Sequence, residues 1–492
     1  MMEFIKTIND AVNGFVWGLP MLVLLIGTGI MMTVRTGFFQ LTHFRHWMKN
    51  TIGAIFRDSH VTAHTGRDDK AISQFQSLCT ALAATVGTGN IAGVSAAIVS
   101  GGPGAIFWMW LVSFFGMMTN YSENVLGIFY RRKNEKGEWC GGAMYYLKDG
   151  LGAKEGMKKV GMVLASAFAL FCVIASFGIG DMSQVNTIAA NMNNAFGVSN
   201  VIVGIILVIL SAFVIIGGIK RIARVTELLV PFMAVAYVIG ALIVIFKNIG
   251  VMPAVFASIF KGAFSMRSAA GGVVGYGVMK ALTWGMKRGV FSNEAGLGSS
   301  VMVHSASNVK EPVAQGMWGI FEVFADTIII CSLTAFTILS SGLVDLETGT
   351  MISTSLSTAL VSEAFSTVFG RAGTAFIAIA VFLFAYSTTL GWSEYGTRAF
   401  EYLFGTRRVI IFRVIFVCFI MVGATMNLSL AWDLSDTFNG LMAIPNLIGV
   451  ITCSSTVIAI TKNYIDRKIR NKDIEPMYSA FEDIQKMQEM AD

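Results

Sequence analysis

Eleven apolar segments, each long enough to cross a bilayer, constrain the fold of this chain more than any other feature. A helix needs roughly 20 predominantly apolar residues to span the hydrocarbon core. With 54% hydrophobic and 13% charged residues and a mean hydropathy of +0.66, the composition is that of a polytopic membrane protein. We therefore predict an all-α integral membrane protein. The segments are 15–34, 75–100, 103–130, 160–180 (helical to about 195), 200–218, 225–247, 272–306, 313–341, 372–402, 408–428 and 433–461.

Two shorter amphipathic stretches, 251–264 and 351–369, are too brief to span and are predicted as surface helices. Segments two to six and seven to eleven each form a unit of five, so the second unit must enter the membrane from the opposite side. The predicted divisions are an N-terminal part with the extra first span and a basic loop (1–74), a first five-helix repeat (75–250), a second, inverted repeat (251–462) and a C-terminal tail (463–492).

Basic residues predict the orientation, since Lys and Arg concentrate in cytoplasmic loops. When Arg35–Gln74 is taken as cytoplasmic and sides alternate, most basic residues fall inside, with Lys287 and Arg288 counted among them. The basic residues assigned to the outside are Lys6, Lys247, Lys261, Arg267 and Arg371. This predicts a multi-pass protein of the cytoplasmic membrane, with the N-terminus outside and the C-terminus inside.

Both five-helix units open with a segment interrupted by glycines. The run Gly87-Thr88-Gly89-Asn90 interrupts the second segment, and 289–298 (Gly-Val-Phe-Ser-Asn-Glu-Ala-Gly-Leu-Gly) interrupts the seventh. Irregular backbone at membrane depth is tolerated where it is buried in protein or lines a cavity, and paired interruptions indicate the site of a secondary transporter. Glycines that serve only close helix packing are the alternative, but the accompanying Thr, Asn, Ser and Glu favour a site.

The two ends of a broken helix suit different chemical groups. The half that begins near Asn90 presents N–H groups and a positive dipole end, which favour a carboxylate. The half that ends near Val86 presents carbonyl oxygens, which favour a small cation. A zwitterionic amino acid with sodium matches both ends, although a carboxylate alone would satisfy one of them.

Hydroxyl side chains in the ninth segment could supply further oxygens to a cation. Ser387-Thr388-Thr389 lie within an apolar run. Alternatively, each hydroxyl bonds the carbonyl one turn back. Trp392 lies one turn beyond Thr388 on the same face, where it could close over a ligand or anchor the helix at the membrane interface.

Phe177, Asp181 and Gln184 recur at helical spacing in the fourth segment and so share one face. Gln184 could hold an amino or carboxyl group, whereas Asp181 could be an ordinary solvated charge at the external interface. Acids within the membrane are functional candidates by default. The remaining ones are Glu123, Glu227, Glu294, Glu322, Asp326 and Glu394.

Signals for other classes of protein are poor. The five histidines show no metal-ligand spacing, and no phosphate-binding loop of the Walker type occurs, so we predict neither an enzyme nor an ATP-driven pump. No nucleic-acid partner is expected, and the sequence indicates no oligomeric state. A channel or a non-transporting sensor stays open as an alternative, but inverted halves favour alternating access.

Three motifs resemble the hallmarks of a known family. The runs 85–94 (Thr-Val-Gly-Thr-Gly-Asn-Ile-Ala-Gly-Val), 101–110 (Gly-Gly-Pro-Gly-Ala-Ile-Phe-Trp-Met-Trp, continuing to Gly116-Met117) and 288–299 (Arg-Gly-Val-Phe-Ser-Asn-Glu-Ala-Gly-Leu-Gly-Ser) resemble the signatures of the alanine or glycine:cation symporters, the sodium:alanine symporter family. The similarity extends over essentially the whole chain.

The resemblance implies eleven helices in a LeuT-type five-plus-five inverted repeat preceded by one extra helix. It also implies import of a small neutral amino acid, alanine or glycine, with sodium; members of the family differ and some take glutamine, and proton coupling occurs in the wider class. The implied substrate-binding residues are Gly87, Thr88, Gly89, Asn90, Phe177, Gln184, Phe291, Asn293, Gly296, Thr388 and Trp392. The implied sodium ligands are carbonyls of Ala84, Thr85 and Val86 and hydroxyls of Ser387 and Thr388.

Overall fold

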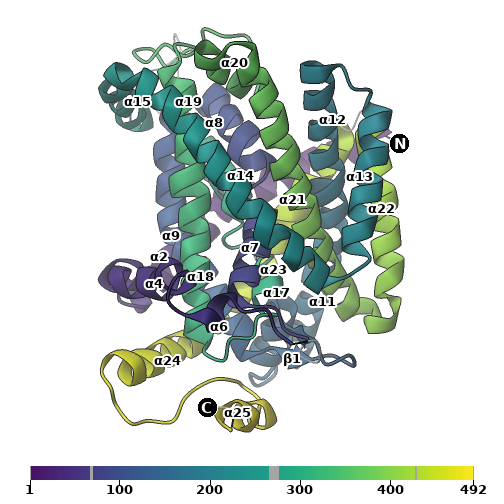
Figure 1. Cartoon of the computed structure of the whole chain (residues 1–492). Coiled ribbons are helices and arrows are strands. Elements are labelled where there is room, and N and C mark those ends of the chain that lie inside the picture. Colours follow the sequence, from purple (N-terminus) through teal and green to yellow (C-terminus); the bar gives the residue numbers. More distant parts are fainter. Residues whose placement is uncertain (1, 67–69, 265–275, 427–428, 491–492) are drawn as a thin grey trace.

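The computed structural model describes residues 2–66, 70–264, 276–426 and 429–490, and nearly all of its regular structure is helical. The long helices run between two ends of the molecule (Figure 1). One end carries α15 (Met252–Phe264) and α20 (Ser357–Phe369). The opposite end, here called the hairpin end, carries the antiparallel strands β1 (Arg132–Lys133) and β2 (Trp139–Cys140) and the C-terminal helix α25 (Glu482–Glu489).

The first half of the chain contains the extra helix and the first broken span. Its remaining elements are α1 (Met2–Val16), α2 (Leu19–Arg35), α3 (Phe39–Thr42), α4 (Phe44–Asn50), α5 (Ile52–Ile55), α6 (Ser59–Thr62), α7 (Gln74–Thr85), η1 (Gly89–Gly93), α8 (Val94–Gly101), α9 (Ala105–Phe129), α10 (Ala143–Tyr145), η2 (Tyr146–Leu151), α11 (Lys158–Phe177), η3 (Gly178–Met182), α12 (Ser183–Phe196), α13 (Asn200–Ile215), α14 (Ile219–Lys247) and η4 (Ile249–Val251).

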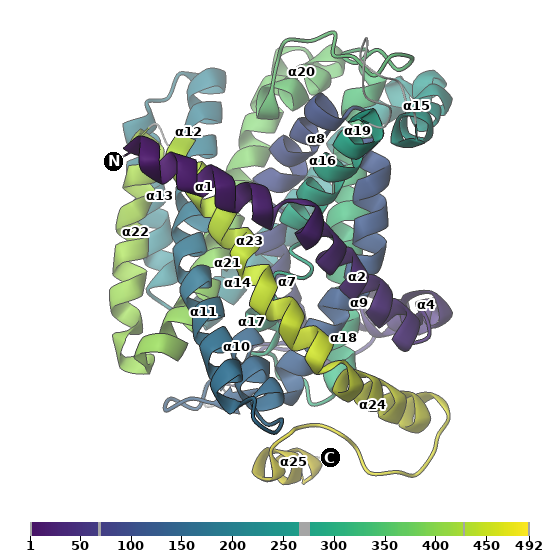
Figure 2. The same ribbon diagram turned by 180° about the vertical axis from the view of Figure 1, so that it is seen from behind.

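The second half contains the second interruption. Its elements are α16 (Tyr276–Asn293), α17 (Val301–His304), α18 (Pro312–Val323), η5 (Phe324–Cys331), α19 (Ser332–Ser340), α21 (Arg371–Phe404), η6 (Thr406–Arg408), α22 (Val409–Thr425), α23 (Ser429–Thr452), α24 (Ser454–Tyr464) and η7 (Ile465–Ile469). Figure 2, seen from the opposite side to Figure 1, shows α23 crossing the near face of the bundle beside α1.

Within the described residues, six helices are long and apolar enough to cross a membrane, or eight when two bent pairs each count as one span. The count of eleven therefore stays a prediction. The fourth segment is one continuous helix over Lys158–Phe196, as the sequence predicts. The last predicted span, 433–461, is bent by 57° where α23 gives way to α24, so its second part does not continue the first.

The predicted seventh span, 272–306, is not one helix. Its first four residues lie outside the described part of the chain, and α16 ends at Asn293. Lys287 and Arg288, counted above among cytoplasmic residues, lie inside α16 within two turns of its end. Lys287 pairs there with Asp436 of α23 at 2.8 Å. Their assignment to a cytoplasmic loop was therefore wrong. Lys287 can lie inside a membrane helix because the Asp436 carboxylate neutralises its charge.

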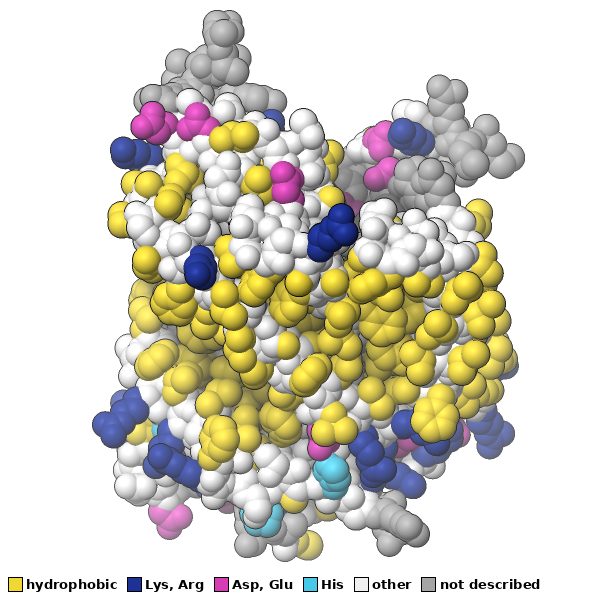
Figure 3. Space-filling view, turned by 45° about the horizontal axis from the view of Figure 1, so that its top comes forward, with side chains coloured by type: hydrophobic (Ala, Val, Ile, Leu, Met, Phe, Trp, Pro, Cys, Tyr) yellow, Lys and Arg dark blue, Asp and Glu magenta, His cyan; other side chains and the backbone are white. Residues whose placement is uncertain are grey.

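A belt of hydrophobic side chains lies on the surface of the molecule between its two ends. Figure 3 shows this belt on one face, with charged side chains gathered beyond it on both sides. Large apolar residues are exposed within it; Phe213 and Leu228 are 71% and 72% exposed. Exposed apolar surface of this extent is unfavourable in water and favourable against lipid.

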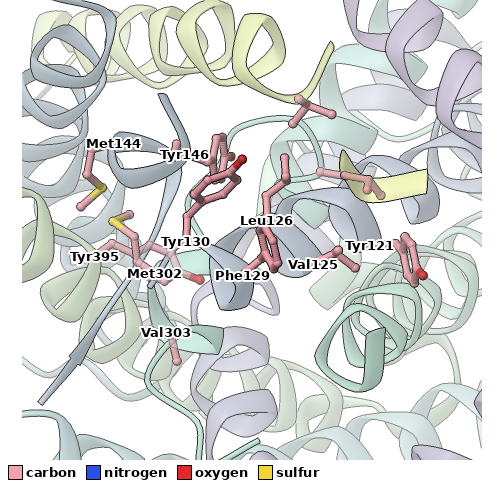
Figure 4. Close-up of a cluster of buried hydrophobic side chains, with 14 of the residues drawn as sticks. Tyr121, Val125, Leu126, Phe129, Tyr130, Met144, Tyr146, Met302, Val303 and Tyr395 are labelled. Atoms are coloured by element: carbon pink, nitrogen blue, oxygen red, sulfur yellow. The ribbon is translucent and has the colours of Figure 1, made fainter. Parts of the chain in front are cut away.

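A buried hydrophobic cluster at the hairpin end packs against α17, which follows the second interruption. Figure 4 shows Leu126 and Phe129 of α9 beside Tyr146, Met302 and other apolar side chains. Gly127 permits this packing, because a Cβ there would lie 2.1 Å from Val301 Cγ2. The core thus fixes α17, the turn of helix that follows the interruption.

The predicted C-terminal tail is docked on the hairpin end. The Ala480 amide donates to the carbonyl of Phe129 at 2.9 Å. Ile484 of α25 packs with Ala71 and Trp139. These contacts hold the end of the chain against the loop between α9 and α10.

Arg398 neutralises a buried acidic cluster near the hairpin end of α21. Its Nε donates to Glu394 Oε1 at 2.7 Å, and its Nη1 donates to Glu401 Oε2 at 2.9 Å and to Glu138 Oε2 at 3.2 Å. Arg398 is 4% exposed, and Glu394 is fully buried. One cation therefore joins α21 to the hairpin loop.

We expect Arg398→Met to lower the free energy of unfolding by about 3–5 kcal/mol, because it leaves buried Glu401 without its cation and Glu394 with only Arg413, at 3.8 Å. The measurement is the thermal unfolding temperature in detergent. Arg407→Met is the matched control, since Arg407 is 92% exposed and approaches the exposed Glu135 only to 3.9 Å. Equal unfolding temperatures for the two variants would contradict this assignment.

Candidate functional site

The two interruptions lie directly against each other in the middle of the bundle. A Cβ placed on Gly89 would lie 3.3 Å from Ser292 Cα and 3.5 Å from Phe291 Cδ1. Ser292 and Phe291 belong to the last turn of α16. Glycine at position 89 thus lets the backbone of η1 approach α16 closely, and the structure brings together the two segments that the sequence singles out.

The first interruption is held by the side chain of Asn90. Helix α7 ends at Thr85, and the amide of Gly87 donates to Asn90 Oδ1 at 2.8 Å instead of to a carbonyl one turn back. The amide of Asn90 donates to the Gly87 carbonyl at 3.3 Å. Asn90 thus satisfies a backbone group that the break would otherwise leave unpaired.

The second interruption is a turn with left-handed backbone at three positions. Glu294, Gly296 and Gly298 have φ values of +56°, +93° and +73°. A Cβ on Gly296 would lie 2.6 Å from Leu25 Cδ2, so both backbone conformation and space favour glycine there. Asn293 stabilises the turn because its Oδ1 accepts from the Ala295 amide at 3.0 Å.

Polar side chains from three other helices fix this turn. Asn446 of α23 donates to the Gly296 carbonyl at 2.9 Å and to Glu123 Oε1 of α9 at 2.5 Å. Glu294 accepts from the Ser299 hydroxyl at 2.5 Å and lies near the side chain of Trp392 in α21. The turn is therefore tied to α9, α21 and α23 together.

Asp326 joins the two interruptions. Its Oδ1 accepts from Asn90 Nδ2 at 2.6 Å, and its Oδ2 accepts from the Ser292 hydroxyl at 2.9 Å and the Thr327 hydroxyl at 2.8 Å. Asp326 lies in η5 and is fully buried. One carboxylate thus links η1 to the last turn of α16.

The predicted sodium region lies where α21 crosses the end of α7. The hydroxyls of Ser387 and Thr388 lie 3.3 and 3.0 Å from the carbonyl oxygen of Ala83. Gly391 permits this crossing, because a Cβ there would lie 2.8 Å from the backbone nitrogen of Ala84. The α7 carbonyl within reach of these hydroxyls, that of Ala83, is thus one residue before the predicted ligands, which are the buried residues Ala84, Thr85 and Val86.

The alternative for the hydroxyls also holds in the structure. Ser387 and Thr388 donate to the Phe384 carbonyl, one turn back, at 2.8 and 3.0 Å. Thr389 donates to its own helix, to Ala385, at 3.1 Å. Thr388 also touches the first interruption, because a Cβ on Gly87 would lie 2.2 Å from Thr388 Oγ1.

Trp392 is 1% exposed, so the interface-anchor alternative for this residue was wrong. It packs edge-on against Tyr395 at 5.4 Å between ring centroids. Gly180 lies against it, since a Cβ at position 180 would be 2.2 Å from Trp392 Cβ. Trp392 therefore lies between the π-helical turn η3 and the second interruption.

The residues predicted on the fourth segment separate into two groups. The ring of Phe177 packs on Phe412, Phe416 and Phe419 of α22, at centroid distances of 5.3, 5.8 and 5.0 Å, and so faces away from the interruptions. Gln184 is buried and donates to the Ile179 carbonyl at 2.9 Å. Asp181 is fully buried, so the solvated-charge alternative was wrong.

Residues that sequence reasoning missed are those that act between segments. Asp326 and Glu123 were recognised only as acids within the membrane, and Asn446 and Ser292 were not singled out. A signal was present for Asn446, an amide side chain within the apolar segment 433–461. Spacing could not have shown which interruption each of these side chains contacts.

Known proteins resemble the chain over nearly its full length. The model of the family described as the sodium:alanine symporter family matches residues 2–479. The sodium/alanine symporter AgcS of Methanococcus maripaludis is 44% identical over 463 residues, 94% of this chain and 98% of that protein. The probable sodium/glutamine symporter GlnT of Bacillus subtilis is 35% identical over 475 residues, 96% of this chain and 93% of that protein.

Among solved structures, MhsT in complex with L-phenylalanine has a TM-score of 0.53 at 14% identity and covers 81% of this chain and 99% of that one. At this identity the likeness concerns the fold alone, and it supports the LeuT-like architecture. The five-plus-five inverted arrangement stays a prediction.

We expect Asp326→Ala to destabilise the protein more than Ser292→Ala. The first substitution leaves the Asn90 amide and the Ser292 hydroxyl with only longer contacts, chiefly to the Cys331 sulfur, at a cost of up to about 1–3 kcal/mol for each buried donor, whereas the second leaves the Asn90 contact in place. Thermal unfolding in detergent measures the difference. A variant Asp326→Ala as stable as Ser292→Ala would show that the carboxylate does not hold the interruptions together.

Proposed function

The chain belongs to the sodium:alanine symporter family, and from this premise we propose that it imports alanine or glycine with sodium by alternating access. Membership makes it a multi-pass membrane protein of a transporter family rather than an enzyme. The observation that carries the proposal is the meeting of a helix C-terminus, two hydroxyls and two facing interruptions within one region of the bundle.

Sodium would bind between α7 and α21. Ser387 and Thr388 each have two acceptors within reach, the Ala83 carbonyl and the Phe384 carbonyl. Each hydroxyl can therefore donate to Phe384 and turn a lone pair toward an ion that the Ala83 carbonyl also coordinates. The carbonyls of Ala84, Thr85 and Val86, at the C-terminal end of α7, supply further oxygens with the negative end of the helix dipole.

The amino acid would bind at the two interruptions. The N–H groups at the start of η1, beside Gly87, Thr88 and Gly89, suit its carboxylate. The close contact of Gly89 with Phe291 and Ser292 favours a small side chain, which supports alanine or glycine. Asn90 and Asn293 hold the broken backbone in position, since their side chains already bond Gly87 and Ala295. Gly296, Thr388, Trp392 and Gln184 complete the proposed pocket.

A glutamine:sodium symporter is the second candidate, supported by the similarity to GlnT, which is lower than that to AgcS. Proton coupling in place of sodium is a third. We further propose the cytoplasmic membrane as the location, with the N-terminus outside and the C-terminus inside, on the evidence of the loop charges.

In proteoliposomes, we expect labelled alanine to accumulate against its gradient only when an inward sodium gradient is imposed. Competition by unlabelled alanine, glycine and glutamine would rank the substrates. Equal accumulation in potassium with a proton gradient would refute sodium coupling, and equilibration without accumulation would indicate a channel.

Thr388→Ala should raise the sodium concentration for half-maximal alanine uptake by about fivefold or more, because it removes one proposed ligand of the ion. Thr389→Ala is the matched control, since the Thr389 hydroxyl bonds the Ala385 carbonyl of its own helix. Sodium titrations of uptake measure both variants. If the two shift the titration equally, the ion does not contact Thr388.

A further inference from the structure

Asp181 differs from the other buried acids of the described chain. Glu123, Glu294, Glu322, Asp326 and Glu394 each have at least one carboxylate oxygen in a hydrogen bond with another side chain. Both oxygens of Asp181 lack a partner, although its side chain is 0% exposed. No ion pair is formed by Asp181 with a described Lys, Arg or His residue.

The side-chain oxygen of Gln184 also lacks a hydrogen-bond donor. Gln184 lies three residues after Asp181 on the same helix face, and it is 2% exposed. Its Nε2 donates to the Ile179 carbonyl at 2.9 Å, which turns its head group back toward the turn that carries Asp181. Its Oε1 has no partner. Three buried oxygens without a donor thus arise from one turn of helix.

The backbone around Asp181 is arranged to bring other helices close. Asp181 lies in the π-helical turn η3, and such turns often mark functional sites. A Cβ on Gly178 would lie 1.3 Å from Ser435 Oγ, and one on Gly180 would lie 2.2 Å from Trp392 Cβ. The two glycines therefore bring α21 and α23 tightly against η3, the turn that carries Asp181.

An ionised carboxylate in such surroundings is strongly unfavourable without a positive partner. A protonated carboxyl group is the neutral alternative, because its hydroxyl could donate to the Gln184 oxygen. A small cation would balance the carboxylate charge, and the unpartnered oxygens of Asp181 and Gln184 could coordinate it.

We propose that Asp181 and Gln184 form a binding site for a monovalent cation. The site adjoins the proposed amino-acid pocket through Gly180 and Trp392, and its interpretation rests on the proposed function. Two sources have the required chemistry, the α-ammonium group of the transported amino acid and a sodium ion additional to the one between α7 and α21.

Asp181→Asn tests the site because asparagine keeps the shape and removes the charge. Binding of radiolabelled sodium, without alanine, and binding of labelled alanine, at saturating sodium, are measured on purified protein. If the cation is the substrate ammonium, the alanine dissociation constant rises about tenfold or more while the sodium count is unchanged. If it is sodium, the number of bound sodium ions falls by one per transporter.

Thr187→Val is the matched control. It lies on the same helix, and its hydroxyl bonds only the nearby Ser183 carbonyl among described groups, so both binding measurements should match those of the unmodified protein. If Asp181→Asn does not yield folded protein, Asp181→Ser also removes the carboxylate and serves in its place, with the same two expected outcomes.

Unchanged sodium count and unchanged alanine affinity in the variant would overturn the proposal and assign Asp181 a neutral structural role. Loss of a proton-driven uptake component alone would overturn it too, since the group would then carry a proton. Because both measurements are made at equilibrium, failure of this site is distinct from failure of the unmodified protein to accumulate alanine with sodium.

Discussion

The carboxylate of Asp326 accepts hydrogen bonds from side chains of both interrupted segments, and the arrangement of the centre depends on it. A broken helix within a membrane frees backbone groups that no water can satisfy. Asn90 satisfies one of them at Gly87, but only while its own amide is held, and Asp326 holds it. The same carboxylate fixes Ser292 at the end of α16. The two interrupted segments are thereby joined into one rigid unit.

Helix α21 connects this unit to the proposed ion site. Thr388 lies against Gly87 and faces the end of α7, and Trp392, one turn further, lies near Glu294 in the second interruption. A shift of α21 along α7 would therefore alter both interruptions together. Because Thr388 and Trp392 lie on the same helix, an ion bound near Thr388 could change the affinity for an amino acid bound beside Trp392.

Features local to one segment could be predicted from the sequence, and contacts between segments could not. The glycines and asparagine near position 90 identified the first interruption, because their composition is incompatible with a lipid-facing helix. The polarity of Ser387 and Thr388 within an apolar segment was also evident, but only the family resemblance, and no local pattern, paired them with the end of α7. The ring of Phe177 points away from the centre because it packs on three phenylalanines of α22. Since α22 is remote in sequence, the spacing within the fourth segment could not show this contact. The same limit applies to Lys287, whose partner Asp436 lies on another helix.

The strengths of these contacts differ in a way that suits alternating access. The Asp326 bonds to Asn90 and Ser292 are buried and converge on one carboxyl group, so α16 and η1 should move as one body. The hydroxyls of Ser387 and Thr388 can give up the Ala83 carbonyl at little cost, since the Phe384 carbonyl is equally near. The contact of α21 with α7 is thus the weaker one in the absence of an ion. An ion that coordinates both helices would strengthen it, and its release would free α21 to separate from the paired interruptions.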